Sequence, residues 1–217
     1  AVIPYLDDLT ESARLIGAVN TVLHQDGLLI GHNTDGIGFF KSLETLRAFH
    51  VRNKRLTILG GGGASTAIIA QAAIAGAKEI PIFCRPKSVE RTVVTVQTIA
   101  QSTGVSLQVL PNNDSQLLAE HINNSDLLIN GTSVGMDGTS LPLPATIRFP
   151  EELLVADVIY QPFETPLLKM ANSQGNPTIN GLGMLLFQAA EAFELWTGKE
   201  MPTDLIWQLL VQKYDIK

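Results

Sequence analysis

The spacing of apolar residues changes near residue 55 and divides the chain into two parts. Before this point, apolar residues at helical spacing predict a helix over 5–16 and another over 35–49. Two short apolar runs, 19–23 and 28–31, stand on either side of an Asp-Gly pair, which predicts a β-hairpin. The first part of the chain is therefore expected to combine helices with one hairpin.

From residue 56 onward, short apolar strands alternate with helices. The strands are expected at 56–60, 79–85, 106–110, 126–131 and 153–160. The helices are expected within 61–77 and at 88–103, 114–122 and 164–173. This alternation predicts a parallel sheet covered on both faces, so the fold class is α/β. Two amphipathic helices, at 181–198 and 203–214, are expected at the end of the sequence.

Composition narrows the classes of protein and site. The 217 residues suffice for one large domain or two small ones, and 45% hydrophobic residues are ordinary for a folded protein. No apolar run is long enough to span a bilayer, and no charged-then-apolar leader is seen, so we expect a cytoplasmic protein without a membrane partner. The single Cys84 excludes an internal disulfide and a multi-cysteine zinc site, and no metal is expected. A net charge of −6 argues against a nucleic-acid partner.

A glycine-rich loop, from Gly60 to Ser65, joins the apolar strand at 56–60 to an alanine-rich helix. Glycines permit a tight turn and let backbone N–H groups approach a pyrophosphate, and the helix N-terminus adds partial positive charge. Ser65 stands where the usual G-x-G-x-x-G pattern has its third glycine. A flexible turn is the alternative, but the position between strand and helix favours dinucleotide binding.

The next strand ends in Cys84-Arg85-Pro86-Lys87, where the adenosine ribose of a bound dinucleotide would lie. An acidic residue there would select NAD, whereas cations accept the 2′-phosphate of NADP. The first acid is Glu90, so Arg85 and Lys87 favour NADP, with NAD as the alternative cofactor. The alternative is that both residues are ordinary surface cations.

Polar residues stand at both ends of the predicted hairpin. Asn33 and Asp35 follow its second strand, where Asn and Asp are common turn formers. Asn20-Thr21 lies inside an apolar run, where a turn former is less expected. Two amides and a carboxylate brought together by one hairpin could bind a polyhydroxylated substrate. The spacing alone leaves both interpretations open.

Six motifs occur in the order found in shikimate dehydrogenases, and the resemblance covers the whole chain. They are "GAVNTV", "GHNTDGIGF", "LGGGGAST", "LLINGTSVGM", "VIYQPFETPLL" and "GLGMLLFQAAEAFELWTG". The resemblance is closest to the quinate/shikimate branch, through "GGGGASTAIIAQAAIAGAKEI". It implies a reversible, nicotinamide-dependent reduction of 3-dehydroshikimate to shikimate. Quinate or another hydroxylated cyclohexane acid as substrate, and an inactive cofactor-binding fragment, are the alternatives.

The resemblance also implies how the chain is organised. Residues 1–35 and 181–217 would form a substrate domain, and residues 36–180 would form a Rossmann-type cofactor domain. The small-molecule substrate, shikimate, 3-dehydroshikimate or quinate, would lie in the cleft between them. The expected assembly is a monomer or a homodimer.

Carried over by motif, the resemblance assigns roles to individual residues. Asn20 would bind the substrate hydroxyls, Asp35 would be the catalytic carboxylate, and Gln188 would reach the substrate from a C-terminal helix. Tyr160 would contact both substrate and nicotinamide. The implied cofactor site consists of Gly60, Gly61, Gly62, Gly63, Ala64, Cys84, Arg85, Pro86, Lys87, Thr132, Ser133, Val158, Tyr160, Gly181 and Met184. Judged by residue type alone, Gln188, Met184 and Tyr160 could instead be ordinary packing residues.

Two departures from the family pattern stand out. The cofactor-selecting stretch begins with Cys84-Arg85-Pro86 where the family usually has Asn and Arg. The sequence also begins without Met, in residues that look like the middle of a helix. We therefore expect that the natural N-terminal part, with the family's serine-rich segment and the lysine that works with Asp35, precedes Ala1.

Overall fold

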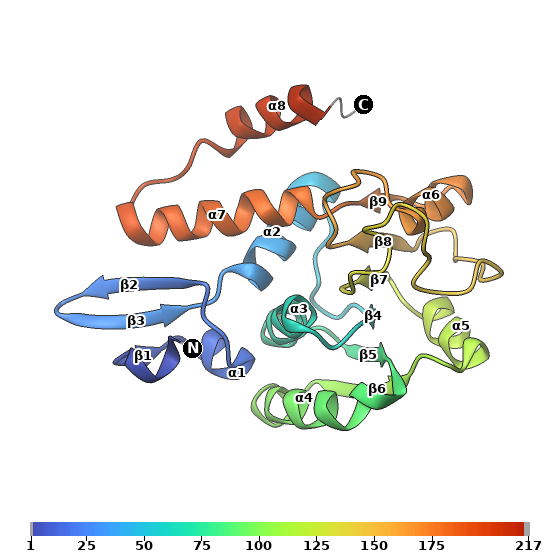
Figure 1. Ribbon diagram of the computed structural model, residues 1–217, viewed down its shortest axis with the longest axis horizontal. Helices are drawn as coiled ribbons and strands as arrows, with labels where there is room; N and C mark the ends of the chain where they lie inside the picture. Colours follow the sequence, from blue (N-terminus) through green and yellow to red (C-terminus); the bar gives the residue numbers. More distant parts are fainter. Residues whose placement is uncertain (1, 215–217) are drawn as a thin grey trace.

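The computed structural model describes residues 2–214, which form two separate sheets and the helices around them (Figure 1). The strands are β1 (Asp8–Leu9), β2 (Thr21–Gln25), β3 (Leu28–His32), β4 (Leu56–Leu59), β5 (Glu79–Cys84), β6 (Ser106–Pro111), β7 (Leu127–Asn130), β8 (Leu154–Asp157) and β9 (Thr178–Ile179). The helices are α1 (Glu11–Ile16), α2 (Asp35–Arg47), α3 (Gly63–Ile74), α4 (Val89–Thr103), α5 (Ser115–Asn123), α6 (Pro166–Ser173), α7 (Leu182–Thr197) and α8 (Thr203–Tyr214). Short 3₁₀ turns occur at Ile3–Tyr5 and Pro86–Ser88.

The larger sheet has the strand order β6-β5-β4-β7-β8-β9, and all its pairings are parallel. The chain starts in the middle with β4, winds outward to β6, and returns to the other side of β4 with β7. This is the doubly wound order of dinucleotide-binding folds, and it opens a crevice at the carboxyl ends of the strands where the winding reverses. The predicted α/β class is confirmed.

Both faces of the larger sheet are covered, as predicted. On one face, α2, α3 and α4 pack over side chains such as Ile58 and Ile82, which are fully buried. On the other face, α5 and α6 pack over Leu128 and Val155. Every residue of β4, β7 and β8 is buried, which explains why these strands are mostly apolar in the sequence, with Thr57, Asn130 and Asp157 as the polar exceptions.

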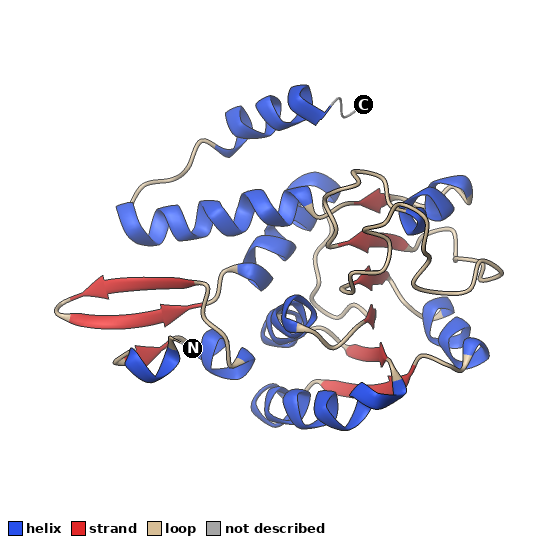
Figure 2. Cartoon of the chain, viewed as in Figure 1, coloured by secondary structure: helices blue, strands red, loops and turns tan. Residues whose placement is uncertain are grey.

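The smaller sheet has the order β1-β3-β2 and stands apart from the larger one (Figure 2). The predicted hairpin is confirmed: β2 and β3 pair antiparallel, and Asp26 (φ 52°) and Gly27 (φ 84°) form the turn. Positive φ at both central residues is what a type I′ hairpin turn requires.

The helix predicted over 5–16 is correct only from Glu11 onward. Asp8 and Leu9 instead form β1, parallel to β3, and Asp7 Oδ2 accepts the N–H of Leu29 (2.7 Å). The side chain of Thr10 then accepts the N–H of Ala13 (3.4 Å) and caps α1. Pairing with the distant strand β3, together with the Thr10 cap, therefore overrode the helical spacing. The two-residue strand β9 was also not predicted.

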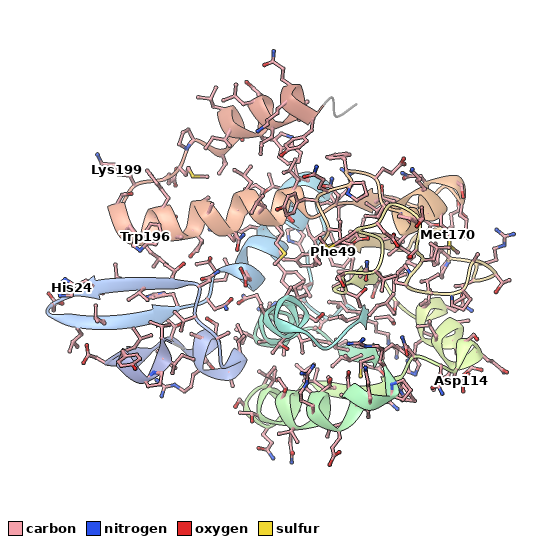
Figure 3. The ribbon with its side chains drawn as sticks, in the orientation of Figure 1. His24, Phe49, Asp114, Met170, Trp196 and Lys199 are labelled. Carbon is pink, nitrogen blue, oxygen red and sulfur yellow. The ribbon has the colours of Figure 1, made fainter. Side chains whose placement is uncertain are left out.

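Helix α2 connects the two sheets and brings α3 and α7 close. A Cβ on Gly36 would lie 2.6 Å from the Cβ of Gln71 on α3, and a Cβ on Gly38 would lie 2.7 Å from the Cα of Gln188 on α7. Glycine on both sides of α2 is therefore required for this close packing. Helix α7 also reaches the hairpin, because Trp196 Nε1 donates to the carbonyl of Val22 (3.0 Å; Figure 3).

The remaining strand and helix predictions are confirmed with boundary differences of a few residues. The largest difference is at the strand predicted over 153–160, which ends at Asp157. Beyond it, the Asp157 side chain accepts the N–H of Ile159 (3.0 Å) and turns the chain out of the sheet. Across residues 2–214, no helix combines the length and apolarity that crossing a membrane requires.

Candidate active-site cleft

Two adjacent hollows open at the carboxyl edge of the larger sheet. The glycine-loop hollow, of about 310 Å³, is lined by Leu59, Gly60, Gly61, Gly62, Phe83, Cys84, Arg85, Ser88, Arg91, Asn112, Gly131, Thr132, Ser133, Val134 and Pro142. The Tyr160 hollow, of about 500 Å³, is lined by Gly131, Thr132, Ser133, Met136, Val158, Ile159, Tyr160 and Gln161. Because both share the turn at 131–133, they form one groove at the point where the strand order reverses.

The glycine loop leaves open space where a pyrophosphate would lie. A Cβ on Gly60 (φ 106°) would lie 2.8 Å from Thr132 Cγ2, and one on Gly61 would lie 2.7 Å from Thr92 Cγ2. A Cβ on Gly62 or Gly63 would meet no protein atom within 4 Å. The first two glycines are thus required by protein packing, whereas the other two leave room at the uncapped N-terminus of α3. A helix N-terminus with this free space fits an anionic pyrophosphate.

Ser65 explains the departure from the G-x-G-x-x-G pattern. It is fully buried, and its hydroxyl donates to the carbonyl of Gly131 (3.1 Å) at the turn after β7. A Cβ added to Gly131 would lie 3.2 Å from the Cβ of Ser65. In this contact the glycine is on the sheet side, at Gly131, so α3 approaches the sheet closely although Ser65 has a side chain.

The cations that line the groove are only partly those that the sequence assigned to the cofactor. Arg85 lines the glycine-loop hollow, whereas Lys87 and Pro86 lie in the exposed 3₁₀ turn and do not line it. Arg91, on the first turn of α4, does line it and was missed. Ser88 and Arg91 are three residues apart and share one helix face, a spacing visible in the sequence. Cys84 lines the hollow but is 4% exposed.

Asn20 and Asp35 come together at the base of the hairpin. Asn20 Nδ2 donates to Asp35 Oδ1 (2.8 Å) and to Thr34 Oγ1 (3.0 Å). Asn20 Oδ1 accepts the N–H of Thr34 (3.0 Å) and the hydroxyl of Thr21 (3.0 Å). The hairpin therefore fixes one oxygen of Asp35, and no hydrogen-bond donor to its other oxygen occurs among residues 2–214.

Burial raises the pKa of Asp35, and the hydrogen bond from Asn20 partly opposes this effect. A carboxyl group with a raised pKa exchanges protons more readily near neutral pH than an ordinary aspartate. Asn33 does not join this pair. It is 4% exposed, donates to the carbonyl of Ala18 (3.3 Å) and accepts the N–H of Asp35 (3.1 Å), so it shapes the start of α2.

The C-terminal residues predicted for the site divide into two groups. The backbone of Gln188 packs against Gly38 on α2. Gly38 is about one helical turn from Asp35, so Gln188 lies near the start of α2. Gly181 caps α7 and donates its N–H to the carbonyl of Ile159 (3.0 Å), behind the Tyr160 hollow. Met184, by contrast, is 8% exposed and packs in the core of the larger sheet, and it does not line either hollow.

Two further features of the site concern metal binding and a buried polar pair. Within residues 2–214, no group of three His, Cys, Asp or Glu side chains could hold a metal ion. A buried pair, Asn130 and Asp157, joins the strand ends beneath the groove, with Asn130 Nδ2 at 3.1 Å from each carboxylate oxygen. The pair was not predicted, although polar residues that end the apolar runs "LLIN" and "LVAD" were a visible signal.

Comparison with known proteins agrees with this geometry. The family model for the shikimate 5′-dehydrogenase C-terminal domain matches residues 181–211. The chain is 81% identical over 217 residues, all of its length, to shikimate dehydrogenase (NADP(+)) of Streptococcus suis, and spans 75% of that protein. It is 59% identical over 213 residues, 98% of its length, to the protein of the same name from Streptococcus sanguinis, of which it spans 74%.

A solved structure shows the same fold. Shikimate 5-dehydrogenase from Listeria monocytogenes, in complex with shikimate and NAD, matches with a TM-score of 0.91 and 44% identity. The match covers 96% of this chain and 73% of the Listeria chain. With the strand order, the groove and the Asn20–Asp35 pair, these similarities show that the chain belongs to the shikimate dehydrogenase family.

Proposed function

We propose that the protein catalyses the reversible reduction of 3-dehydroshikimate to shikimate with NADPH, a step of aromatic amino-acid biosynthesis. The observation that carries the proposal is the Asn20–Asp35 pair, which presents one free carboxylate oxygen at the base of the hairpin. The names of the Streptococcus relatives support both the reaction and the cofactor. Because the proposed reaction is a biosynthetic step that uses NADPH, we also propose a cytoplasmic location.

The groove residues would hold the cofactor in an extended conformation. Gly62, Gly63 and the N-terminus of α3 would receive the pyrophosphate, where the helix dipole favours negative charge. Arg85 and Arg91 would contact the 2′-phosphate from the two sides of the Pro86–Ser88 turn. The Tyr160 hollow would receive the nicotinamide, which supplies a hydride to the substrate when bound.

The substrate half of the reaction needs a positioned proton. Reduction adds a hydride to the carbonyl carbon and a proton to its oxygen, and oxidation removes both. Asn20 holds Oδ1 of Asp35 at 2.8 Å, so Oδ2 is free for a substrate hydroxyl or for a partner group that carries the proton. We propose that residues 1–35 and 181–217 form the substrate domain, with Gln188 as a further substrate contact, and that residues 36–180 form the cofactor domain.

The experiment that tests the proposal is a spectrophotometric assay of NADP⁺ reduction with shikimate, with quinate and with no substrate. We expect turnover with shikimate that depends on Asp35. Faster turnover with quinate would assign the protein to quinate oxidation instead. Binding of NADPH without turnover of either acid would show that the protein is a cofactor-binding module, and the proposed function would be wrong.

A further inference from the structure

A buried polar network lies beneath the groove, between the carboxyl ends of two neighbouring strands. Asn130 ends β7, Asp157 ends β8, and the two residues are paired in the sheet register. They are 0% and 1% exposed, so neither side chain reaches a ligand in the groove. Asn130 Nδ2 lies 3.1 Å from each oxygen of the Asp157 carboxylate.

On the β7 side, the network sets the turn shared by both hollows. Asn130 Oδ1 accepts the N–H (3.1 Å) and the hydroxyl (2.7 Å) of Thr132, which lines both hollows. Asn130 Nδ2 also donates to the carbonyl of Val134 (3.0 Å). The methyl group of Thr132 is in turn the neighbour that a Cβ on Gly60 would meet. A shift of Asn130 would therefore move the wall of the groove opposite the glycine loop.

On the β8 side, the network sets the segment that lines the Tyr160 hollow. Asp157 Oδ1 accepts the N–H of Ile159 (3.0 Å), and Oδ2 accepts the hydroxyl of Thr165 (2.8 Å). Thr165 caps α6 through the N–H of Leu168 (3.3 Å). The carboxylate thus holds three elements together: the end of β7, the chain leaving β8, and the start of α6.

We propose that Asp157 is a positioning residue for the cofactor: through Asn130 and Ile159, it fixes both walls of the groove in the shape that binds NADP(H). The inference rests on the proposed function, because it assigns the groove to that cofactor. It does not require Asp157 to touch any ligand.

The chemistry of the neighbours explains why a carboxylate is needed. Asn130, Ile159 and Thr165 all donate to Asp157, and an ionised carboxylate is an acceptor at both oxygens. An amide at this position would present its own N–H groups to the N–H groups of Asn130. Burial raises the pKa of Asp157 to about 6, against the effect of these three hydrogen bonds, and no charged side chain among the described residues contributes. The group is therefore largely ionised at pH 7.5.

The test compares Asp157→Asn with a matched control at the opposite end of the same strand. Asn176 is also buried, at 4% exposure, and its Nδ2 donates to the carbonyls of Pro150 (2.6 Å) and Leu153 (3.2 Å), before β8 begins. Asn176→Asp removes this donor and destabilises the same strand away from the groove. For wild type and each variant, we would measure the Kd for NADPH by titration at pH 7.5, the KM for shikimate at saturating cofactor, and the Tm.

We expect both variants to lower the Tm, but only Asp157→Asn to raise the Kd for NADPH, by about tenfold, with the KM for shikimate within about twofold of wild type. The exchanged pair Asn130→Asp/Asp157→Asn restores one carboxylate–amide contact and should recover part of the affinity. If Asp157→Asn does not fold, Thr165→Val removes one donor to the carboxylate and should raise the Kd in the same direction by a smaller factor.

Three results would overturn the inference. The first is a folded Asp157→Asn protein that binds NADPH like wild type. The second is an equal loss of affinity in Asn176→Asp, which would make the effect one of general stability. The third, wild-type protein that does not bind NADPH at all, would overturn the proposed function as well, so the two failures are distinguishable.

Discussion

The cations beside the glycine-loop hollow lead to a sharp prediction about cofactor choice. Arg85 and Arg91 line the hollow, whereas Lys87 carries the same charge two residues from Arg85 but does not line it. We therefore expect Arg85→Ala and Arg91→Ala to weaken NADPH binding selectively, and Lys87→Ala to serve as a control that also removes one positive charge.

The magnitude follows from the exposure of the two arginines. A charge-assisted hydrogen bond is worth about 1.5–3 kcal/mol when shielded, but an exposed ion pair contributes only about 0.2–1 kcal/mol. Both arginines are exposed in the free protein and would be partly covered by the bound cofactor. An intermediate loss of about 1–1.5 kcal/mol for each corresponds to a roughly fivefold to twelvefold rise in Kd. At physiological ionic strength, screening over about 8 Å limits the effect of Lys87 to less than about twofold.

The assay is a fluorescence titration of NADPH and NADH with wild type and the three variants, at 0.15 M salt. The Kd for NADH should change less than about twofold in all of them, because NADH lacks the 2′-phosphate. Equal weakening of both cofactors by Arg91→Ala would mean that Arg91 contacts the shared pyrophosphate. If Lys87→Ala weakens NADPH binding as much as the arginine variants do, the assignment of the 2′-phosphate contacts to Arg85 and Arg91 is wrong.

Three other predictions test the substrate side, the helix packing and the buried carboxylate. Asp35→Asn in the enzyme should lower kcat by about two to four orders of magnitude with little change in NADPH binding, and a near-normal kcat would reduce Asp35 to a turn residue. Gly38→Ala should lower the free energy of unfolding, measured by denaturant titration, by about 1–3 kcal/mol, because a Cβ there displaces the backbone of Gln188. The same variant should raise the KM for shikimate, and an unchanged KM would exclude Gln188 from the substrate site. The third concerns pH: the pKa of Asp157 is raised from 3.8 to about 6 in the folded protein, so folding favours its protonated form. This contribution to stability is fully present below about pH 4 and is lost as pH rises to about 6, and the difference of about 2.2 (6 − 3.8) is worth about 3 kcal/mol. Denaturant titrations between pH 4 and 7 should show this fall in wild type relative to Asp157→Asn, and parallel curves would contradict the cause assigned to the pKa.

The sequence was sufficient for the central strands of the larger sheet because β4, β7 and β8 are buried on both faces, whereas the two-residue edge strand β9 was not predicted. A buried strand such as β4 is mostly apolar, and a short apolar run between helical segments has few other interpretations. The hairpin was also predictable, because Asp26-Gly27 adopts the positive φ values that its turn needs. The segment before α1 was not, because bonds such as that of Asp7 to Leu29 join residues far apart in the sequence.

The same distinction explains which parts of the candidate site could be predicted. Asn20 and Asp35 stand at the two ends of a predictable hairpin, so their proximity followed from local geometry, although the motif order was needed to give them a role.

The choice between Lys87 and Arg91 depends on where a 3₁₀ turn ends and α4 begins, and helix boundaries are the least certain part of a pattern. Met184 packs in the core of the larger sheet, and its assignment to the nicotinamide stays a prediction, because an apolar residue near a cofactor and one in the core have the same chemistry. Asp157 had a distinct signal, a carboxylate at the end of a buried apolar run, where an unpaired charge would be costly. Such a residue needs hydrogen-bond partners, and the polar residue that ends the adjacent buried strand, Asn130, was the one partner that the sequence pattern itself could indicate.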